Sequence, residues 1–261
     1  MALEGKTALV TGSTGGIGRA IARALAREKA TIVIHGLGDP AKTERFRSSL
    51  EAESGVRVVF VEANLEKADE ATRLIETATE AVGKIDILIN NAGAIHAAPI
   101  ETHPPEQWDA VMAVNLSAAF HTTRMALPQM RARNWGRIVN ISSAYGLVGG
   151  VDRVSYIASK FGLIGLTKAV AMETANSAIT CNAVCPGYVS SPHIKKKIQE
   201  TSASEGISLE AAEANLVSEL MPAGKALKPE QVADVVAFLC SDAASEIRGA
   251  AWSVDGGWTA R

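Results

Sequence analysis

Short runs of apolar and β-branched residues alternate along this chain with longer amphipathic stretches. Each run has the length of a strand, and in order they are Thr7–Thr11, Thr31–His35, Val56–Ala63, Lys84–Asn91, Gly136–Ser142, Ala178–Gly187 and Gly249–Gly256. The intervening stretches have helical periodicity and include Ile17–Glu28, Lys67–Val82, Trp108–Met130, Ser155–Thr174 and Pro229–Leu239. Strands that are apolar throughout are buried on both faces. The alternation therefore predicts an α/β fold with a doubly wound parallel sheet of about seven strands, flanked by helices.

The alternation of predicted strands and helices is interrupted once, by a long polar stretch. We see no linker, low-complexity tract or repeat, so we expect a single domain over residues 1–261. Residues 190–228, however, form a long polar connection after the sixth run. Long connections are usually functional or disordered, and ligands bind at the carboxyl ends of strands in such sheets. We therefore favour a substrate lid over residues 190–228, and the alternative is a helical hairpin on the surface.

Composition narrows the class of protein. The 261 residues carry a formal net charge of -2, which argues against nucleic acid or an anionic membrane as the main partner. No apolar run has the length needed to span a bilayer, and we expect no signal peptide. The cysteines Cys181, Cys185 and Cys240 form no Cys-x-x-Cys pair, so we expect buried thiols, no metal site and a cytoplasmic location.

A glycine-rich segment, Thr11–Gly18, follows the first predicted strand and opens the first predicted helix. Gly12 can take a positive φ and turn the chain tightly. Gly16 and Gly18 let the backbone approach a pyrophosphate and let the helix pack on the strand. The helix that starts near Ile17 then directs its free N–H groups toward the phosphates. The order of strand, glycine loop and helix predicts a Rossmann-type dinucleotide site.

The residues after the second strand bear on the choice between NAD and NADP. An acidic residue there would hold the ribose hydroxyls of NAD, and an Arg would suit the 2′-phosphate of NADP. This chain has Gly36 and Leu37 there, and Ser13 and Thr14 in the glycine loop are not basic. A phosphate beside Leu37 would be poorly compensated, so the sequence favours NAD. Lys42 is the nearest cation that could reverse this, and a solvated helix face is its alternative role.

A serine and a Tyr-x-x-x-Lys pair carry the candidate chemistry. Ser143 follows the strand Gly136–Ser142, and Tyr156 and Lys160 lie one turn apart on the next predicted helix. A free phenol has a pKa of about 10, which a nearby cation lowers. Lys160 can supply that cation, Tyr156 can act as general acid or base, and Ser143 can hold the reacting oxygen. This set suits hydride chemistry at an alcohol or ketone, and the alternative is a structural Tyr beside a solvated Lys.

Together these motifs resemble the short-chain dehydrogenase/reductase family over essentially the whole chain. The matching segments are Thr11–Gly18, Asn90–Gly93, Val114–Leu116, Tyr156–Lys160, Pro186–Val189 and Val254–Gly257. The resemblance implies a catalytic tetrad of Asn115, Ser143, Tyr156 and Lys160. In this family the Tyr is the acid or base, the Lys lowers its pKa and holds the nicotinamide ribose, and the Asn holds a water in a proton relay.

The same resemblance implies which residues surround the dinucleotide. Asn90–Gly93 would lie against the adenosine ribose, and Val189 would meet the nicotinamide carboxamide. Asn64 departs from the family, which usually has Asp near the adenine, but an amide can also donate and accept there. The full predicted cofactor set is Gly12, Thr14, Gly16, Ile17, Gly18, Leu37, Asn64, Leu65, Asn91, Ala92, Gly93, Tyr156, Lys160, Pro186, Gly187 and Val189.

Within the family the chain is most similar to D-3-hydroxybutyrate dehydrogenases. The segments that carry this similarity are Gly36–Asp39, Trp108–Ala110, Asn115–His121, Ala144–Tyr156 and Val254–Arg261. Those enzymes use NAD and hold a small carboxylate with a cluster of polar side chains. The similarity therefore implies an NAD-dependent oxidoreductase that interconverts a small anionic 3-hydroxy acid, such as 3-hydroxybutyrate, and its 3-oxo acid.

The polar cluster of that group is altered in this chain. The group usually has Gln, His, Lys and Gln where this chain has, in order, Ile95, Tyr145, Arg153 and Lys197. Where this chain has Tyr188, the group has Trp or sometimes Tyr. Arg153 keeps a cation and adds a fork suited to a carboxylate, whereas Ile95 removes a polar contact. A longer, doubly charged or sulfonated hydroxy acid would also fit. For Lys197 a solvated helix face is an equal alternative. The predicted substrate contacts are Ile95, His96, Ser143, Tyr145, Arg153, Tyr188 and Lys197.

Other functions and assemblies stay open at this point. One alternative is a reductase or dehydrogenase of a 3-oxoacyl thioester, a sugar acid or a sulfonate; another is a silent dinucleotide-binding protein, which the complete tetrad disfavours. The resemblance also implies a homotetramer, with the helices Trp108–Met130 and Ser155–Thr174 as its main interface. We interpret His35, His103 and His121 as structural.

Overall fold

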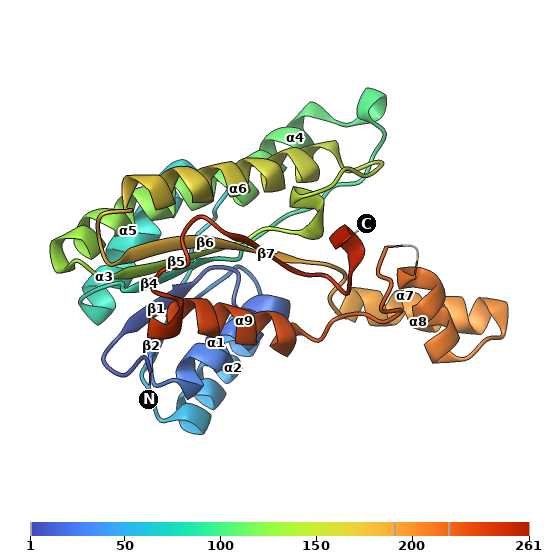
Figure 1. Cartoon of the computed structure of the whole chain (residues 1–261). Helices are drawn as coiled ribbons and strands as arrows, with labels where there is room; N and C mark the ends of the chain where they lie inside the picture. The colour runs from blue at the N-terminus through green and yellow to red at the C-terminus, as the bar shows by residue number, and fades with distance from the viewer. Residues whose placement is uncertain (1, 191, 219, 261) are drawn as a thin grey trace.

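The computed structural model describes residues 2–190, 192–218 and 220–260 and confirms the predicted α/β fold (Figure 1). Within these residues seven strands form one sheet in the order β3-β2-β1-β4-β5-β6-β7, and every neighbouring pair is parallel. The strands are β1 Thr7–Val10, β2 Thr31–His35, β3 Val58–Val61, β4 Ile87–Asn90, β5 Gly136–Ile141, β6 Ile179–Pro186 and β7 Ala251–Val254. Successive strands are added on one side of β1 up to β3 and on its other side from β4 onward. Sheets of this kind bind ligands beside the point where the strand order reverses, here between β1 and β4.

Helices cover both faces of the sheet (Figure 1). One face carries α1 Gly16–Arg27, α2 Pro40–Ser54 and α9 Pro229–Cys240. The helices on the other side are α3 Ala68–Val82, α4 Pro105–Met112, α5 Ala118–Arg133 and α6 Val154–Glu173. The short turns are η1 Ile100–Thr102, η3 Ala144–Gly146, η4 Asp242–Ala244 and η5 Trp258–Ala260. No helix in the described part of the chain is apolar over a length that would cross a bilayer.

The two faces of the sheet account for the uninterrupted apolar strands. Along β1, Val10 packs into the core beneath α1 and α9, whereas its neighbour Leu9 packs into the core beneath α3, α5 and α6. In β2, Ile34 and Val33 divide between the same two cores. Each fully buried aliphatic side chain contributes roughly 1.5–3 kcal/mol relative to exposure. Both faces therefore need apolar residues, and the strands show no polar alternation.

The predicted helix Trp108–Met130 is interrupted. After α4 the backbone forms one π-helical turn, η2 Ala113–Ser117, before it continues as α5 to Arg133. Asn115 lies within that turn and is buried. A π turn adds one residue to the helical repeat, so it rotates the side chains on either side of it relative to one another. Hydrophobic periodicity does not reveal a single inserted residue, and the sequence therefore predicted one regular helix.

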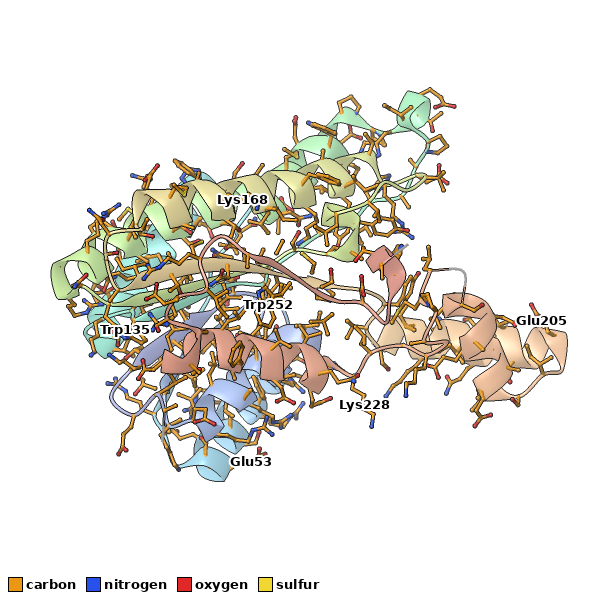
Figure 2. The ribbon with its side chains drawn as sticks, viewed as in Figure 1. Glu53, Trp135, Lys168, Glu205, Lys228 and Trp252 are labelled. Atoms are coloured by element: carbon orange, nitrogen blue, oxygen red, sulfur yellow. The ribbon has the colours of Figure 1, made fainter. Side chains whose placement is uncertain are left out.

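Residues 190–228 form a helical hairpin at one end of the molecule (Figure 1). Its helices are α7 Pro192–Glu205 and α8 Leu209–Val217, and Figure 2 places Glu205 at the outer tip. The two ends of the segment are joined, because Leu227 N–H donates to Tyr188 O at 2.8 Å and Ser190 N–H donates to Leu227 O at 2.8 Å. The hairpin matches the alternative weighed from the sequence, and its role as a lid stays a prediction.

Candidate functional site

A cavity of about 420 Å³ lies at the carboxyl ends of β1 to β4. It collects eight residues of the predicted cofactor set from four separate loops. These are Gly12, Thr14, Leu37, Asn64, Leu65, Asn91, Ala92 and Gly93. The other lining residues are His35, Gly36, Ala63, Glu66, Ala94 and Val114.

The glycine loop leaves no room for side chains on its inner side. Gly12 has φ +62°, and a Cβ there would lie 2.8 Å from Ala92 Cα. A Cβ on Gly18 would collide with Gly12 O, so the first turn of α1 lies against the end of β1. Asn91 fixes this arrangement, because its Nδ2 donates to Thr11 O at 2.9 Å and to Gly12 O at 3.1 Å. A backbone cradle of this kind suits a pyrophosphate, so these residues fit a bound dinucleotide.

The part of the cavity at Gly36 and Leu37 has no cationic side chain among its described lining residues. Gly36 packs so closely that a Cβ would meet the Thr14 side chain, and Leu37 follows with 56% of its surface exposed. Among the described residues that line the cavity, the charged side chain is Glu66, an acid. This lining disfavours a second phosphate on the adenosine ribose.

Ser143 and Tyr156 are brought together as the sequence predicted. Ser143 follows β5, and its side chain hydrogen-bonds to the partly buried Tyr156 in the first turn of α6. Burial raises the pKa of the Tyr156 phenol, while the Ser143 hydrogen bond and then the charge of Arg153 lower it. The net direction is upward, so Tyr156 keeps its proton at neutral pH.

Lys160 is buried and hydrogen-bonds to the end of β5. The side chain is 3% exposed, Nζ donates to Ile141 O at 2.8 Å, and Nζ lies 5.5 Å from the centre of the Tyr156 ring. Burial lowers the pKa of Lys160 to about 8, because its charge is desolvated. The charge that lowers the pKa of Tyr156 in this structure is that of Arg153, and the expected effect of Lys160 on Tyr156 stays a prediction.

The side chain of Asn115 forms three hydrogen bonds. Its Oδ1 accepts from Ala94 N–H at 2.7 Å, and its Nδ2 donates to Ala94 O at 2.9 Å and to Ser159 Oγ at 3.0 Å. The Ser159 hydroxyl in turn donates to Tyr156 O at 2.7 Å. Sequence reasoning missed Ser159, although it lies directly before Lys160 in the Tyr-x-x-x-Lys motif. This chain of bonds links the π turn to the helix that carries the tyrosine and the lysine.

The Ser143–Tyr156 pair adjoins the dinucleotide cavity. Gly93 lines that cavity, and a Cβ built on it would lie 3.4 Å from Asn115 Oδ1 and 3.8 Å from Lys160 Nζ. Of the remaining predicted cofactor residues, Gly187 packs against Asp255 so closely that its Cβ would lie 2.9 Å from Asp255 Cα. Gly16 and Ile17 begin α1, and Pro186 and Val189 flank Gly187 at the end of β6, where Val189 packs against the core.

Tyr145 and Arg153 lie beside Tyr156, and Tyr188 packs against the same apolar group as Tyr145. The Tyr145 ring lies 6.4 Å from the Tyr156 ring and edge-on to Trp258 at 4.8 Å between centres. Tyr188 packs against the same small apolar group, which also contains Ala144, Met221 and Trp258. The Cζ atom of Arg153 is 5.5 Å from the centre of the Tyr145 ring. Trp258 is thus a second residue that sequence reasoning did not place at the site.

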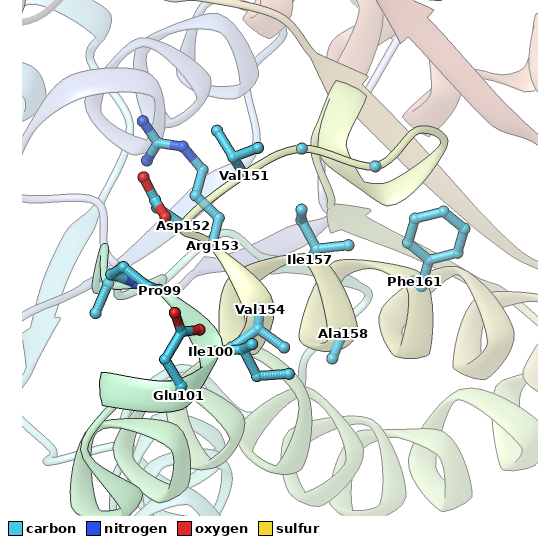
Figure 3. A pocket seen from close by; sticks show the side chains of 13 residues that line it. Pro99, Ile100, Glu101, Val151, Asp152, Arg153, Val154, Ile157, Ala158 and Phe161 are labelled. Atoms are coloured by element: carbon cyan, nitrogen blue, oxygen red, sulfur yellow. The ribbon is translucent and has the colours of Figure 1, made fainter.

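The guanidinium of Arg153 forms neither a hydrogen bond nor an ion pair within the described residues, although its charge acts on Tyr156. The acids Glu101 and Asp152 line the same cavity as Arg153 without forming an ion pair with it. Figure 3 shows Arg153 at the start of α6, where it also borders a second cavity of about 620 Å³. A guanidinium that no described carboxylate binds directly, beside a phenol that can move a proton, is suited to bind an anion.

The other predicted substrate residues are not joined to this group. Ile95 is 55% exposed, and the His96 ring packs edge-on against His103 at 5.2 Å. In the described part of the chain, no hydrogen bond or ring contact joins His96 to Tyr145 or Arg153. Lys197 belongs to α7, but its side chain lies outside the described part of the structure.

Comparison with known proteins identifies relatives over the full chain. A family model described as short chain dehydrogenase matches residues 6–214. The D-beta-hydroxybutyrate dehydrogenase of Cupriavidus necator is 46% identical over 261 residues, covering 99% of this chain and 100% of the relative. A protein of the same name from Rhizobium meliloti is 43% identical over 256 residues, covering 98% and 99%. The 3-oxoacyl-(acyl-carrier-protein) reductase of Thermotoga maritima is 37% identical over 262 residues, covering 98% and 99%.

Proposed function

This chain belongs to the short-chain dehydrogenase family, and from that premise we propose that it interconverts a small anionic 3-hydroxy acid and its 3-oxo acid with NAD. Family membership makes it an oxidoreductase that acts on CH–OH groups with a nicotinamide dinucleotide. The observation that carries the substrate proposal is that the Arg153 guanidinium beside Tyr156 has no hydrogen-bond or ion-pair partner among the described residues. The names of the two hydroxybutyrate dehydrogenase relatives make 3-hydroxybutyrate the first candidate.

When bound in the cavity lined by Gly12, Asn91 and Gly93, NAD would supply the hydride acceptor for the carbinol carbon of the substrate. Tyr156 takes the proton from the substrate hydroxyl during oxidation and returns it to the carbonyl oxygen during reduction. The Ser143 hydroxyl donates a hydrogen bond to that oxygen as its charge develops. Lys160 helps to hold the nicotinamide ribose, and Asn115 holds the water that relays the proton. Arg153 binds the carboxylate and so orients the carbinol carbon toward the dinucleotide.

The preference for NAD over NADP is supported by the lining at the end of β2. Leu37 is the exposed side chain there, and Glu66 is the charged lining residue among those described. A 2′-phosphate would lose water without gaining a cation, whereas a ribose hydroxyl carries no such cost. We therefore propose that Leu37 and the backbone of Gly36 accept NAD.

A homotetramer is supported by exposed apolar residues on α5, α6 and the short turn η1. Phe120 of α5 is 46% exposed, Phe161 of α6 is 47% exposed, and Ile100 of η1 is 73% exposed. The 620 Å³ cavity shown in Figure 3 continues this surface, with Ile157 and Phe161 along one wall. Such a patch is typical of a subunit contact. We propose that Trp108–Met130 and Ser155–Thr174 form the main interface between copies.

The hairpin and the thiols support two smaller proposals. Residues 190–228 reach Tyr145 and Trp258 through Met221, so movement of the hairpin would open or cover the candidate substrate position within the single domain. We propose that it acts as a lid.

Cys181, Cys185 and Cys240 are free and buried, in keeping with a cytoplasmic location.

A 3-oxoacyl thioester reductase is the second candidate, favoured by the similarity to the Thermotoga maritima enzyme. A substrate deuterated at the carbinol carbon distinguishes the two. Under our proposal, (R)-3-hydroxybutyrate with deuterium at C3 transfers it to NAD, and mass spectrometry detects deuterated NADH. Reduction of acyl thioesters with NADPH, without transfer from any free hydroxy acid, would support the alternative and contradict the proposal. A sugar acid or a hydroxy sulfonate can be tested as a donor in the same way.

A further inference from the structure

His35, the last residue of β2, joins the two loops on either side of the dinucleotide cavity. The side chain is 3% exposed. Gly12 N–H in the glycine loop donates to Nδ1 at 3.1 Å, and Nε2 lies 3.0 Å from Ala63 O in the loop after β3. Gly12, His35 and Ala63 all line the cavity. One imidazole therefore spans from the glycine loop to the opposite wall.

The partners of the ring determine its protonation. A backbone N–H can only donate and a backbone carbonyl can only accept, so Nδ1 must be bare and Nε2 must carry the hydrogen. This neutral tautomer satisfies both nitrogens. A second proton would direct an Nδ1–H at the N–H of Gly12 and place a charge in a buried site. Burial accordingly lowers the pKa of His35, and the hydrogen bond to Ala63 O only partly opposes this.

The surroundings of the ring are neutral apart from one acid. The backbone of His35 is fixed by Ser13, because His35 N–H donates to Ser13 Oγ at 2.9 Å and Ser13 N–H donates to His35 O at 2.8 Å. The glycine loop and residues 36–37 contribute no charged side chain to the cavity in the described part of the chain. The loop after β3 contributes Glu66, which is exposed.

We infer that His35 is a positioning residue for the dinucleotide, which as the neutral Nε2–H tautomer holds the glycine loop and the loop after β3 at a fixed separation. This inference rests on the proposal that the dinucleotide occupies this cavity. It also means that His35 does not serve as the cation for a 2′-phosphate, although it stands close to the position that distinguishes NAD from NADP. The sequence interpreted His35 as structural, and the proposal assigns that structural role to the shape of the dinucleotide cavity.

Two substitutions separate the hydrogen bonds from the bulk of the ring. His35→Leu fills the space but offers Gly12 no acceptor, whereas His35→Asn places Oδ1 where Nδ1 accepts. The leucine variant should bind NADH about tenfold more weakly by fluorescence titration, with kcat at saturating NAD within about threefold of wild type. The asparagine variant should recover most of the affinity. His121→Leu, which removes a histidine from α5 outside the cavity, is the matched control and should leave the affinity unchanged.

Three results would overturn the inference. One is NADH affinity in His35→Leu equal to wild type; another is equal loss in the leucine and asparagine variants. The third comes from ¹⁵N NMR of histidine-labelled wild-type protein, with the His35 ring assigned by its proximity to the Gly12 amide proton. A neutral ring protonated at Nε2 is expected near neutral pH, and an imidazolium or the Nδ1–H tautomer would contradict it even if the variants do not fold. If wild-type protein itself fails to bind NADH, the cofactor proposal has failed, and only the hydrogen bonds and the tautomer of His35 remain.

Discussion

Replacing Arg153 with alanine tests whether its guanidinium binds the carboxylate of the substrate. A hydrogen bond to a charged group contributes about 1.5–3 kcal/mol, and the lower figure applies because Arg153 is partly exposed. At about 1.4 kcal/mol per factor of ten, this predicts a roughly tenfold rise in KM for an anionic hydroxy acid. A neutral secondary alcohol has no carboxylate to lose, so its KM should change by less than about twofold.

The same substitution should also alter the pH profile. The charge of Arg153 lowers the pKa of Tyr156, so its removal raises that pKa further. Oxidation needs Tyr156 without its proton, and the rise of kcat with pH should therefore move to higher pH for both substrates. Arg153→Lys keeps the charge without the planar fork, so it should keep the wild-type pH profile and only part of the affinity.

The assay is the initial rate of NADH formation, with substrate varied at saturating NAD across neutral and alkaline pH. It compares wild type, Arg153→Ala and Arg153→Lys with one anionic and one neutral substrate. Equal changes of KM for the two substrates would refute the anion site. An unchanged pH profile in Arg153→Ala would refute the electrostatic link between Arg153 and Tyr156.

Three further results are expected. Tyr156→Phe should lower turnover by about 10³-fold while NADH binding, measured by fluorescence, is kept; substantial turnover would contradict the role of the phenol as acid or base. Because burial raises the pKa of Tyr156, oxidation by the wild type should quicken and reduction should slow as pH rises, which initial rates in both directions would reveal; parallel profiles would argue against one shared group. Ser159→Ala removes the acceptor of Asn115 and should cost about 1 kcal/mol, lowering Tm by about 2–4 °C with a fall in kcat but little change in KM for NAD. An unaltered kcat, measured with Ser159→Thr as the conservative control, would show that this hydrogen bond does not position Asn115.

The fold was predictable because its main signal is local. The continuous apolar runs of β1 and β2 require a sheet covered on both faces, and seven such runs predicted seven strands. The glycine loop could be recognised from Gly12 and Gly18, since their backbone contacts exclude a Cβ. The π turn at Asn115 could not be predicted, because one inserted residue leaves the hydrophobic pattern almost unchanged.

The candidate site was predicted in its residues more fully than in its electrostatics. Ser143 and Tyr156 were expected to meet, and they do. The balance of charges at Tyr156 depends on distances across the fold, however, and in this structure the charge of Arg153 lowers the pKa of Tyr156. His35 and Ser159 were missed for a similar reason: His35 bonds to Gly12 and Ala63, and Ser159 bonds to Asn115, which are pairs far apart in sequence. Single-residue patterns do not encode such contacts.

The proposed activity is tested most directly by NADH formation from NAD⁺ and (R)-3-hydroxybutyrate with the purified protein, measured by ultraviolet absorbance beside a parallel reaction with NADP⁺. We expect rapid reduction of NAD⁺ and little reduction of NADP⁺. If 3-hydroxybutyrate fails but a longer or doubly charged hydroxy acid reacts with NAD⁺, the anion site stands and the substrate is revised. A protein that binds NADH yet oxidises no anionic hydroxy acid, or that prefers NADP⁺, would contradict the proposed NAD-dependent oxidation of an anionic hydroxy acid.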